Sequence, residues 1–281
     1  MILRFTKMHG CGNSYVYVDG INQNLNNLNL NELSIKFSDK NFGIGSDGVI
    51  FIFNSTISNA KMKMFNSDGS EGSMCGNGIR CTYKFLLDKK IIKNIKKVNI
   101  ETKSGIKSLY LIKNENNKAL IKVNMGTPEF NPKKIPVLIN KKEIIQENIL
   151  INNIKYKINC VSIGNPHCVI FKNEISNLNL NKFYFYDNIF PKGVNVEFAK
   201  ILNKNKLKLR VLERGSGETL SCGTGACASV VMGVKNGLLK ENFDIKVKLL
   251  GGELTIHYDT IKNIVYMTGE AVSIFDGMIK I

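Results

Sequence analysis

The chain has 281 residues, of which 43% are hydrophobic and 22% charged, a composition typical of a globular protein and not of a disordered one. Its formal net charge is +16, but the lysines are spread along the chain and form no arginine-rich stripe, which disfavours nucleic-acid binding. No segment predicts a membrane span, and the first residues, MILRFTKMHG, lack the pattern of a secretion signal. We therefore expect a cytoplasmic protein with no nucleic-acid or membrane partner.

In chain order, apolar and β-branched runs predict strands and spaced apolar residues predict helices. The first half contains predicted strands at 15–19, 48–53 and 61–65 and a helix at 75–87. Turn residues at 124–128 mark a domain boundary, and the second half contains predicted strands at 168–171, 194–198 and 207–212 and a helix at 222–239. The segment GIGSDG at 43–48 fits a dinucleotide-binding pattern, but a strand follows it where a helix is needed, so we interpret it as a turn.

Three short signatures occur twice in the same order at nearly constant spacing, which indicates an internal duplication. The pairs are Gly12-Asn13 with Gly164-Asn165, Gly43-Ile44-Gly45 with Gly193-Val194-Asn195, and the glycine-rich segments around Cys75 and Cys222. We therefore expect an α+β fold of two similar domains, each of which contributes an equivalent group to a shared site.

Cys75 and Cys222 each follow a glycine-rich turn and precede a Gly-x-Gly that opens a helix. The positive end of a helix dipole favours a thiolate, so it should lower the pKa of each thiol. The glycines at 76, 78, 223 and 225 would let backbone amides approach an anionic ligand. One ionised and one protonated thiol can act as general base and general acid on opposite faces of one carbon, which is the chemistry of a cofactor-free amino-acid epimerase.

The alternative is that a cysteine is only a small buried hydrophobic residue, and we accept it for the five others: Cys11, Cys81, Cys160, Cys168 and Cys227. The chain has no C-x-x-C and only three histidines, so the spacing of a zinc site is missing and we expect no metal.

Six segments extend this interpretation: KMHGCGN, FNSDGSEGSMCGNGIRC, SIGNPHCV, GVNVEF, LERGSGETLSCGTGACA and YMTGEA. In order and spacing they resemble the diaminopimelate epimerase family over essentially the whole chain. The resemblance implies a mixed β-sheet or barrel wrapped around a central helix in each half. It also implies a homodimer that interconverts LL- and meso-2,6-diaminoheptanedioate, for lysine and peptidoglycan precursor synthesis, without pyridoxal phosphate or metal. The expected halves are 1–124 and 125–268, with 269–281 returning to the first.

The same resemblance assigns roles to individual residues. It makes Cys75 and Cys222 the acid/base pair, and His167 and Glu213 the residues that modulate the thiol pKa values. The positions that match substrate-binding residues are Asn13, Asn66, Gly76, Asn77, Asn165, Asn195, Glu213, Arg214, Gly223 and Thr224.

The chain departs from the family pattern at three positions. Ser14 stands where many members have Asp, Gly48 where some have a substrate-contacting Gln, and Phe275 where some have a Tyr at the dimer interface. Two alternatives remain open. One is a proline or hydroxyproline racemase, whose substrate has no second amino-acid end, and the other is a basic binding protein without catalysis.

Overall fold

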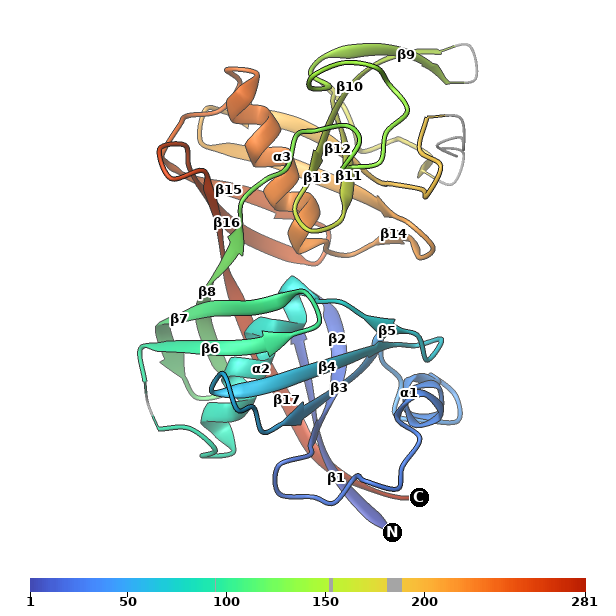
Figure 1. Cartoon of the computed structure of the whole chain (residues 1–281), viewed down its shortest axis with the longest axis vertical. Coiled ribbons are helices and arrows are strands. Elements are labelled where there is room, and N and C mark those ends of the chain that lie inside the picture. The colour runs from blue at the N-terminus through green and yellow to red at the C-terminus, as the bar shows by residue number, and fades with distance from the viewer. Residues whose placement is uncertain (94, 152–153, 181–188) are drawn as a thin grey trace. The chain divides into compact units, whose positions relative to one another are not determined.

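The computed structural model of the chain describes residues 1–93, 95–151, 154–180 and 189–281 (Figure 1). The chain divides into two compact units. Unit 1 consists of Met1–Val123 and Thr268–Ile281, and unit 2 of Asn124–Met267. Within the described ranges, no helix is long and apolar enough to cross a membrane.

Unit 1 contains a closed barrel of eight strands, because the strands pair successively from β1 through β8 and β17 back to β1. The pairs β2–β3 and β4–β6 are parallel. The short strand β5 (Glu71–Gly72) pairs with β4 outside this ring. The barrel strands are β1 (Ile2–Gly10), β2 (Asn13–Asp19), β3 (Gly48–Phe53), β4 (Ala60–Asn66), β6 (Lys97–Thr102), β7 (Gly105–Glu115), β8 (Lys118–Gly126) and β17 (Ile264–Lys280).

Helix α2 (Gly76–Asp88) is buried from Gly76 to Leu86 and contacts β1, β2 and β3, so it fills the barrel of unit 1 (Figure 1). A second helix, α1 (Leu30–Ser38), packs against β3 and β4 and buries Leu33 and Phe37. Asn29 caps α1 by accepting a hydrogen bond from the backbone amide of Glu32. Helix α1 was not predicted, because its apolar residues span only about two turns.

Unit 2 repeats this plan. Its parallel pairs are β11–β12 and β13–β15, and its helix α3 (Gly223–Lys235) contacts β10, β11, β12 and β16. The prediction of an α+β fold with strands around a central helix in each half is confirmed. The strands are β9 (Glu147–Ile151), β10 (Ile154–Ser162), β11 (Pro166–Phe171), β12 (Asn195–Asn203), β13 (Lys206–Glu213), β14 (Gly217–Thr219), β15 (Asp244–Leu249) and β16 (Gly252–Asp259).

All six predicted strands are present, and β3 begins at Gly48, directly after the GIGSD turn. The second predicted helix is shorter than expected. It was predicted to extend to Leu239, but α3 ends at Lys235 and Asn236 forms its C-cap. Gly237 then adopts a φ of +66°, a left-handed conformation that ends helices.

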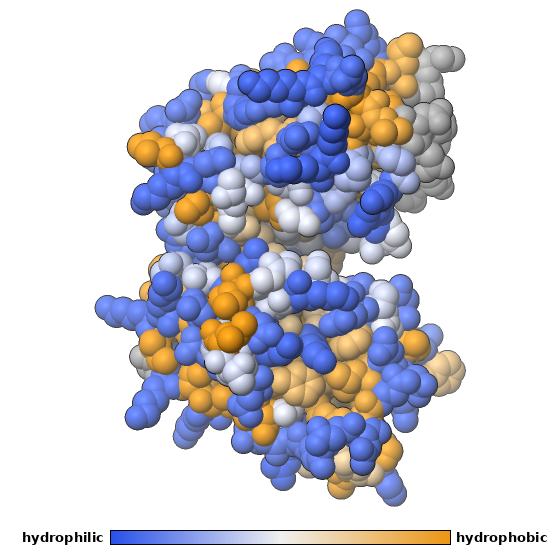
Figure 2. All heavy atoms as spheres, viewed as in Figure 1, coloured by the Kyte–Doolittle hydropathy of each residue, from blue (hydrophilic) through white to orange (hydrophobic). Residues whose placement is uncertain are grey.

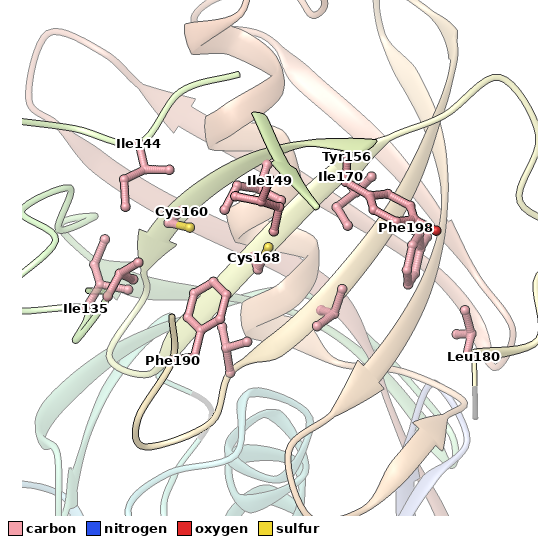
Figure 3. Close-up of a cluster of buried hydrophobic side chains, with 14 of the residues drawn as sticks. Ile135, Ile144, Ile149, Tyr156, Cys160, Cys168, Ile170, Leu180, Phe190 and Phe198 are labelled. Carbon is pink, nitrogen blue, oxygen red and sulfur yellow. The ribbon is translucent and has the colours of Figure 1, made fainter. Parts of the chain in front are cut away.

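The core of unit 2 joins β10, β11 and β12 to the loops that follow and precede them (Figure 3). Cys160 and Cys168 are register partners on β10 and β11, and both lie inside this core (Figure 3). Cys11, Cys81 and Cys227 are also buried, so all five cysteines outside the two glycine-rich turns are internal, as expected. Hydrophilic side chains cover most of the visible face of each unit, with hydrophobic ones scattered among them (Figure 2).

Candidate active site

Cys75 occupies the N-cap of α2 in an extended conformation, with φ −119° and ψ 123°. Its Sγ atom accepts a hydrogen bond from the amide of Gly78 at 3.3 Å, and its thiol donates one to Oδ1 of Asn13 at 3.2 Å. The side chain is only partly buried. The sulfur is therefore held at the positive end of the helix.

Cys222 has the same place in unit 2. It is the N-cap of α3, with φ −118° and ψ 112°, and its Sγ accepts from the amide of Gly225 at 3.4 Å. A further contact of 3.4 Å joins Sγ to Oγ1 of Thr224. The duplicated sequence thus builds two equivalent helix starts, each capped by a thiol. Gly76 and Asn77 begin α2, and Gly223 and Thr224 begin α3.

The electrostatic setting of Cys222 differs from the expectation. Burial raises the pKa of this thiol well above its usual value, and the carboxylate of Glu213 raises the pKa further. Hydrogen bonds from Thr224 and Gly225 act in the opposite direction but are weaker. The expected net lowering of the pKa is therefore wrong for Cys222, because burial outweighs the hydrogen bond from the Gly225 amide at the helix terminus.

In unit 1, a network of amides surrounds Cys75. The side chain of Asn77 donates to Oδ1 of Asn13 at 3.5 Å and accepts from the guanidinium of Arg80 at 2.9 Å. Arg80 is completely buried, and Asn13 also donates to Asp47 at 2.9 Å. The structure therefore brings the predicted residues Asn13, Asn77 and Cys75 together.

Asn66 and Gly48 face each other across β3 and β4. Asn66 donates to Oγ of Ser70 at 3.0 Å. A Cβ atom at position 48 would lie 2.2 Å from the carbonyl oxygen of Phe65, so the fold has no room for a Gln there. Gly48 can contribute only its backbone.

In unit 2, Oδ1 of Asn165 lies 3.0 Å from Nε2 of His167, whose Nδ1 lies 2.7 Å from Oε1 of Glu197. Asn195 accepts from the backbone amide of Arg214 at 2.8 Å. The predicted pair Asn165 and His167 is thus in direct contact, and Asn195 holds the chain at Arg214.

The two adjacent charged residues make separate contacts. Glu213 accepts from Oγ1 of Thr219 at 2.5 Å, and the Arg214 guanidinium donates to the carbonyl of Lys192 at 2.6 Å. Glu213 acts on Cys222 through its charge. Phe275, the predicted interface residue, lies on β17, where its ring packs edge-on against Phe5 with 6.0 Å between centroids.

Three residues of these hydrogen-bond networks were not among the predicted site residues: Asp47, Arg80 and Glu197. A signal for two of them was present, because Asp47 and Glu197 are the fifth residues of the repeated segments GIGSD and GVNVE. Each of these carboxyl groups is linked by hydrogen bonds to the asparagine of a repeated Gly-Asn motif. The link is direct in unit 1 and passes through His167 in unit 2.

Solved structures with low sequence identity share this fold. The PhzF-family phenazine biosynthesis protein of Bacillus anthracis aligns over 100% of both chains with a TM-score of 0.74 and 17% identity. A hydroxyproline epimerase from Agrobacterium vitis has a TM-score of 0.70 and 13% identity, covering 99% of this chain and 92% of its own. The fold is thus one that epimerases adopt.

Sequence comparison identifies the family. The family model described as diaminopimelate epimerase matches residues 5–131 and 159–274. A diaminopimelate epimerase of Methanococcus maripaludis is 45% identical over 99% of this chain and 100% of its own, and one of Acetivibrio thermocellus is 44% identical over 99% of both. The chain belongs to the diaminopimelate epimerase family and is an isomerase, which confirms the resemblance found in the sequence.

Proposed function

We propose that this protein interconverts LL- and meso-2,6-diaminoheptanedioate by a two-base mechanism in which Cys75 and Cys222 exchange protons with one carbon, without pyridoxal phosphate or metal. One observation carries the proposal. Each duplicated unit begins its central helix with a cysteine whose sulfur accepts a helix amide, at 3.3 Å in α2 and 3.4 Å in α3. The choice of diaminopimelate as the substrate rests on membership of the diaminopimelate epimerase family.

The reaction moves one proton off the carbon and another onto it. A thiolate takes the α proton from one face and becomes a thiol, and the second thiol gives its proton to the opposite face and becomes a thiolate. The roles are then reversed for the return reaction. Because burial and the carboxylate of Glu213 raise the pKa of Cys222, we assign this thiol as the acid. The thiol of Cys75, which donates to Asn13, must lose its proton before it can act as the base.

The substrate supplies anionic and cationic groups that the site residues match. The carboxylate at the reacting carbon binds the amides of Gly76, Asn77, Gly223 and Thr224, because helix N-termini favour anions. Further substrate contacts, including those to the distal amino-acid end, come from Asn13, Asn66, Asn165, Asn195, Glu213 and Arg214, with Gly48 contributing backbone only. Arginine can hold a carboxylate through two hydrogen bonds, and a glutamate can accept from an ammonium group.

The biological setting follows from that substrate. We place the enzyme in the cytoplasm, as a homodimer that supplies precursors for lysine and peptidoglycan. Its two functional halves are 1–124, which carries Cys75, and 125–268, which carries Cys222, and 269–281 returns to the first half.

Deuterium incorporation tests this function. Reduced, purified protein in D₂O should place solvent deuterium at the α carbon of diaminopimelate while LL and meso forms interconvert, with no added cofactor. Proline and hydroxyproline are the comparison substrates, because they have no distal amino-acid end to pair with the charged residues. Exchange into proline but not diaminopimelate would assign a racemase, and exchange into none of them would contradict the enzymatic assignment.

A further inference from the structure

Glu197 is a completely buried acid that no step of the proposed reaction uses. It lies on β12, and its Oε1 is 2.7 Å from Nδ1 of His167. A Cβ atom at Gly225, in the first turn of α3, would lie 2.7 Å from the same oxygen. Its other oxygen, Oε2, has no hydrogen-bond partner in the described part of the chain. The carboxyl group is therefore packed behind the helix start that Cys222 caps.

Glu197 is the far end of a short chain of hydrogen bonds. His167 is also fully buried, and its second nitrogen, Nε2, lies 3.0 Å from Oδ1 of Asn165. Asn165 is half-buried. The order Glu197, His167, Asn165 thus runs from the interior of unit 2 to a residue that the proposed function places on the substrate.

The positions of the protons follow from these two contacts. Oδ1 of Asn165 can only accept, so Nε2 of His167 must carry a hydrogen. The Nδ1 atom then either accepts from a protonated Glu197 or donates to its carboxylate as part of an imidazolium ion. In both states the pair holds one shared proton and has no net charge.

Three observations favour this neutral pair. Both side chains are completely buried, where a net charge is expensive. The carboxylate of Glu213 lies near enough to repel an additional negative charge, and burial raises the pKa of Glu197. The unpartnered Oε2 is also less costly as the carbonyl oxygen of a neutral acid than as part of a carboxylate.

The equivalent asparagine of unit 1 shows what the intervening histidine changes. Asn13 donates its Nδ2 group directly to Asp47 at 2.9 Å, so its Oδ1 is left facing the thiol of Cys75 at 3.2 Å. In unit 2 the imidazole N–H of His167 donates a hydrogen bond to the side-chain oxygen of Asn165 instead. The two repeated asparagines therefore present opposite ends, an acceptor in unit 1 and a donor in unit 2.

We propose that Glu197 is a positioning residue that acts through His167 to fix the amide of Asn165 with its oxygen toward the imidazole and its NH₂ group toward the substrate. The NH₂ group is a donor and matches a carboxylate oxygen of the substrate. This last point rests on the proposed function, whereas the orientation of the amide does not.

Two substitutions separate orientation from charge. The side chain in Glu197→Gln can donate to Nδ1 and so replaces a protonated Glu197, whereas the side chain in Glu197→Met has similar size but no hydrogen bond. We expect Glu197→Gln to keep kcat/KM within about threefold and Glu197→Met to lose about tenfold, mainly through KM, since one oriented hydrogen bond to a charged group is lost. Glu241→Met, at an exposed position, is the control and should leave the kinetics unchanged.

The tautomer of His167 is the second readout, measured from its imidazole ¹⁵N resonances in the ligand-free protein. Wild type and Glu197→Gln should show a protonated Nε2, and Glu197→Met should show a mixture of tautomers. An unprotonated Nε2 in the wild type would overturn the proposal, as would wild-type kinetics in Glu197→Met or an equal loss of activity in both variants. If Glu197→Met does not fold, the wild-type spectrum and the Glu197→Gln kinetics decide. A protonated Nε2 in a protein that does not epimerise diaminopimelate would refute the proposed function and leave the orientation standing.

Discussion

The two capping cysteines have different neighbours although their backbone conformations match. Cys75 is partly exposed and donates to an amide oxygen of Asn13. Cys222 is buried beside Glu213 and Glu197, and these surroundings raise its pKa. The two thiols at equivalent helix starts thus have different surroundings, and only for Cys222 does burial beside carboxyl groups favour the protonated form.

Glu213→Gln tests the charge contribution to Cys222. After burial, Glu213 is the largest cause of the raised pKa of this thiol, so its neutralisation should lower the pKa. We expect the pH midpoint for alkylation of Cys222 by iodoacetamide, followed by peptide mass spectrometry, to fall by about one pH unit. Glu218→Gln is the matched control, because that carboxylate already pairs with Arg210 at 2.7 Å. An unchanged or higher midpoint in Glu213→Gln would contradict the assignment.

Among the secondary-structure elements, helices α2 and α3 each begin at a cysteine that is also a proposed acid/base group. Both α2 and α3 begin after an extended cysteine that satisfies one free amide of the first turn. Serine is a strong N-cap and alanine a poor one. The same position therefore contributes to helix stability and, in the proposed mechanism, to proton transfer, and substitutions can separate the two effects.

Serine and alanine substitutions at Cys75 and at Cys222 make this separation. The serine variants should be more stable than the alanine variants by about 1 kcal/mol in urea unfolding, because only serine can accept the amide hydrogen bond. The alanine variants should lose at least about 100-fold in the rate at which LL and meso diaminopimelate interconvert, since inversion needs an acid/base group on each face of the carbon. Equal stability of the two variants would mean that the cysteines do not cap their helices. Near-native epimerisation by an alanine variant would rule out that cysteine as an acid/base group.

Helix α1 shows where local patterns fail. Its nine residues contain few apolar positions, and the helix depends on packing against β3 and β4. Helix α3 shows the reverse, because apolar residues continue to Leu239 although Gly237 has already left the helical conformation. Apolar spacing indicates which segments pack inside, but the last turn depends on backbone conformation.

At the scale of the molecule, the last strand completes the first unit. Strand β17 pairs with β1 from Ile2 opposite Lys280 onward, so the barrel of unit 1 closes only when the end of the chain returns to its beginning. The exposed part of this strand carries three large apolar residues, Ile274, Phe275 and Met278. Exposed apolar residues grouped on one strand are typical of a surface that binds another protein.

Phe275→Glu tests the proposed homodimer. Wild type should sediment as a dimer, and a charge at this 49% exposed ring should weaken the association by at least about tenfold in Kd if the ring is central to the interface. Ile261→Glu, at a residue that is 88% exposed in unit 2, is the control and should remain dimeric. A monomeric wild type, or a Phe275→Glu variant that associates normally, would contradict the interface.

The duplication, the six predicted strands, the two helices that follow Cys75 and Cys222, and the family could all be predicted from the amino-acid sequence, because they depend on local patterns and ordered motifs. The pKa direction of Cys222 and the contact of Glu197 with His167 could not be predicted without the folded structure. Both depend on burial and on side chains that are distant along the chain: Glu197 precedes Cys222 by many residues, yet β12 brings its carboxyl group against the first turn of α3. Desolvation and charge act through space, so a local motif can place a thiol at a helix start but cannot indicate its protonation state.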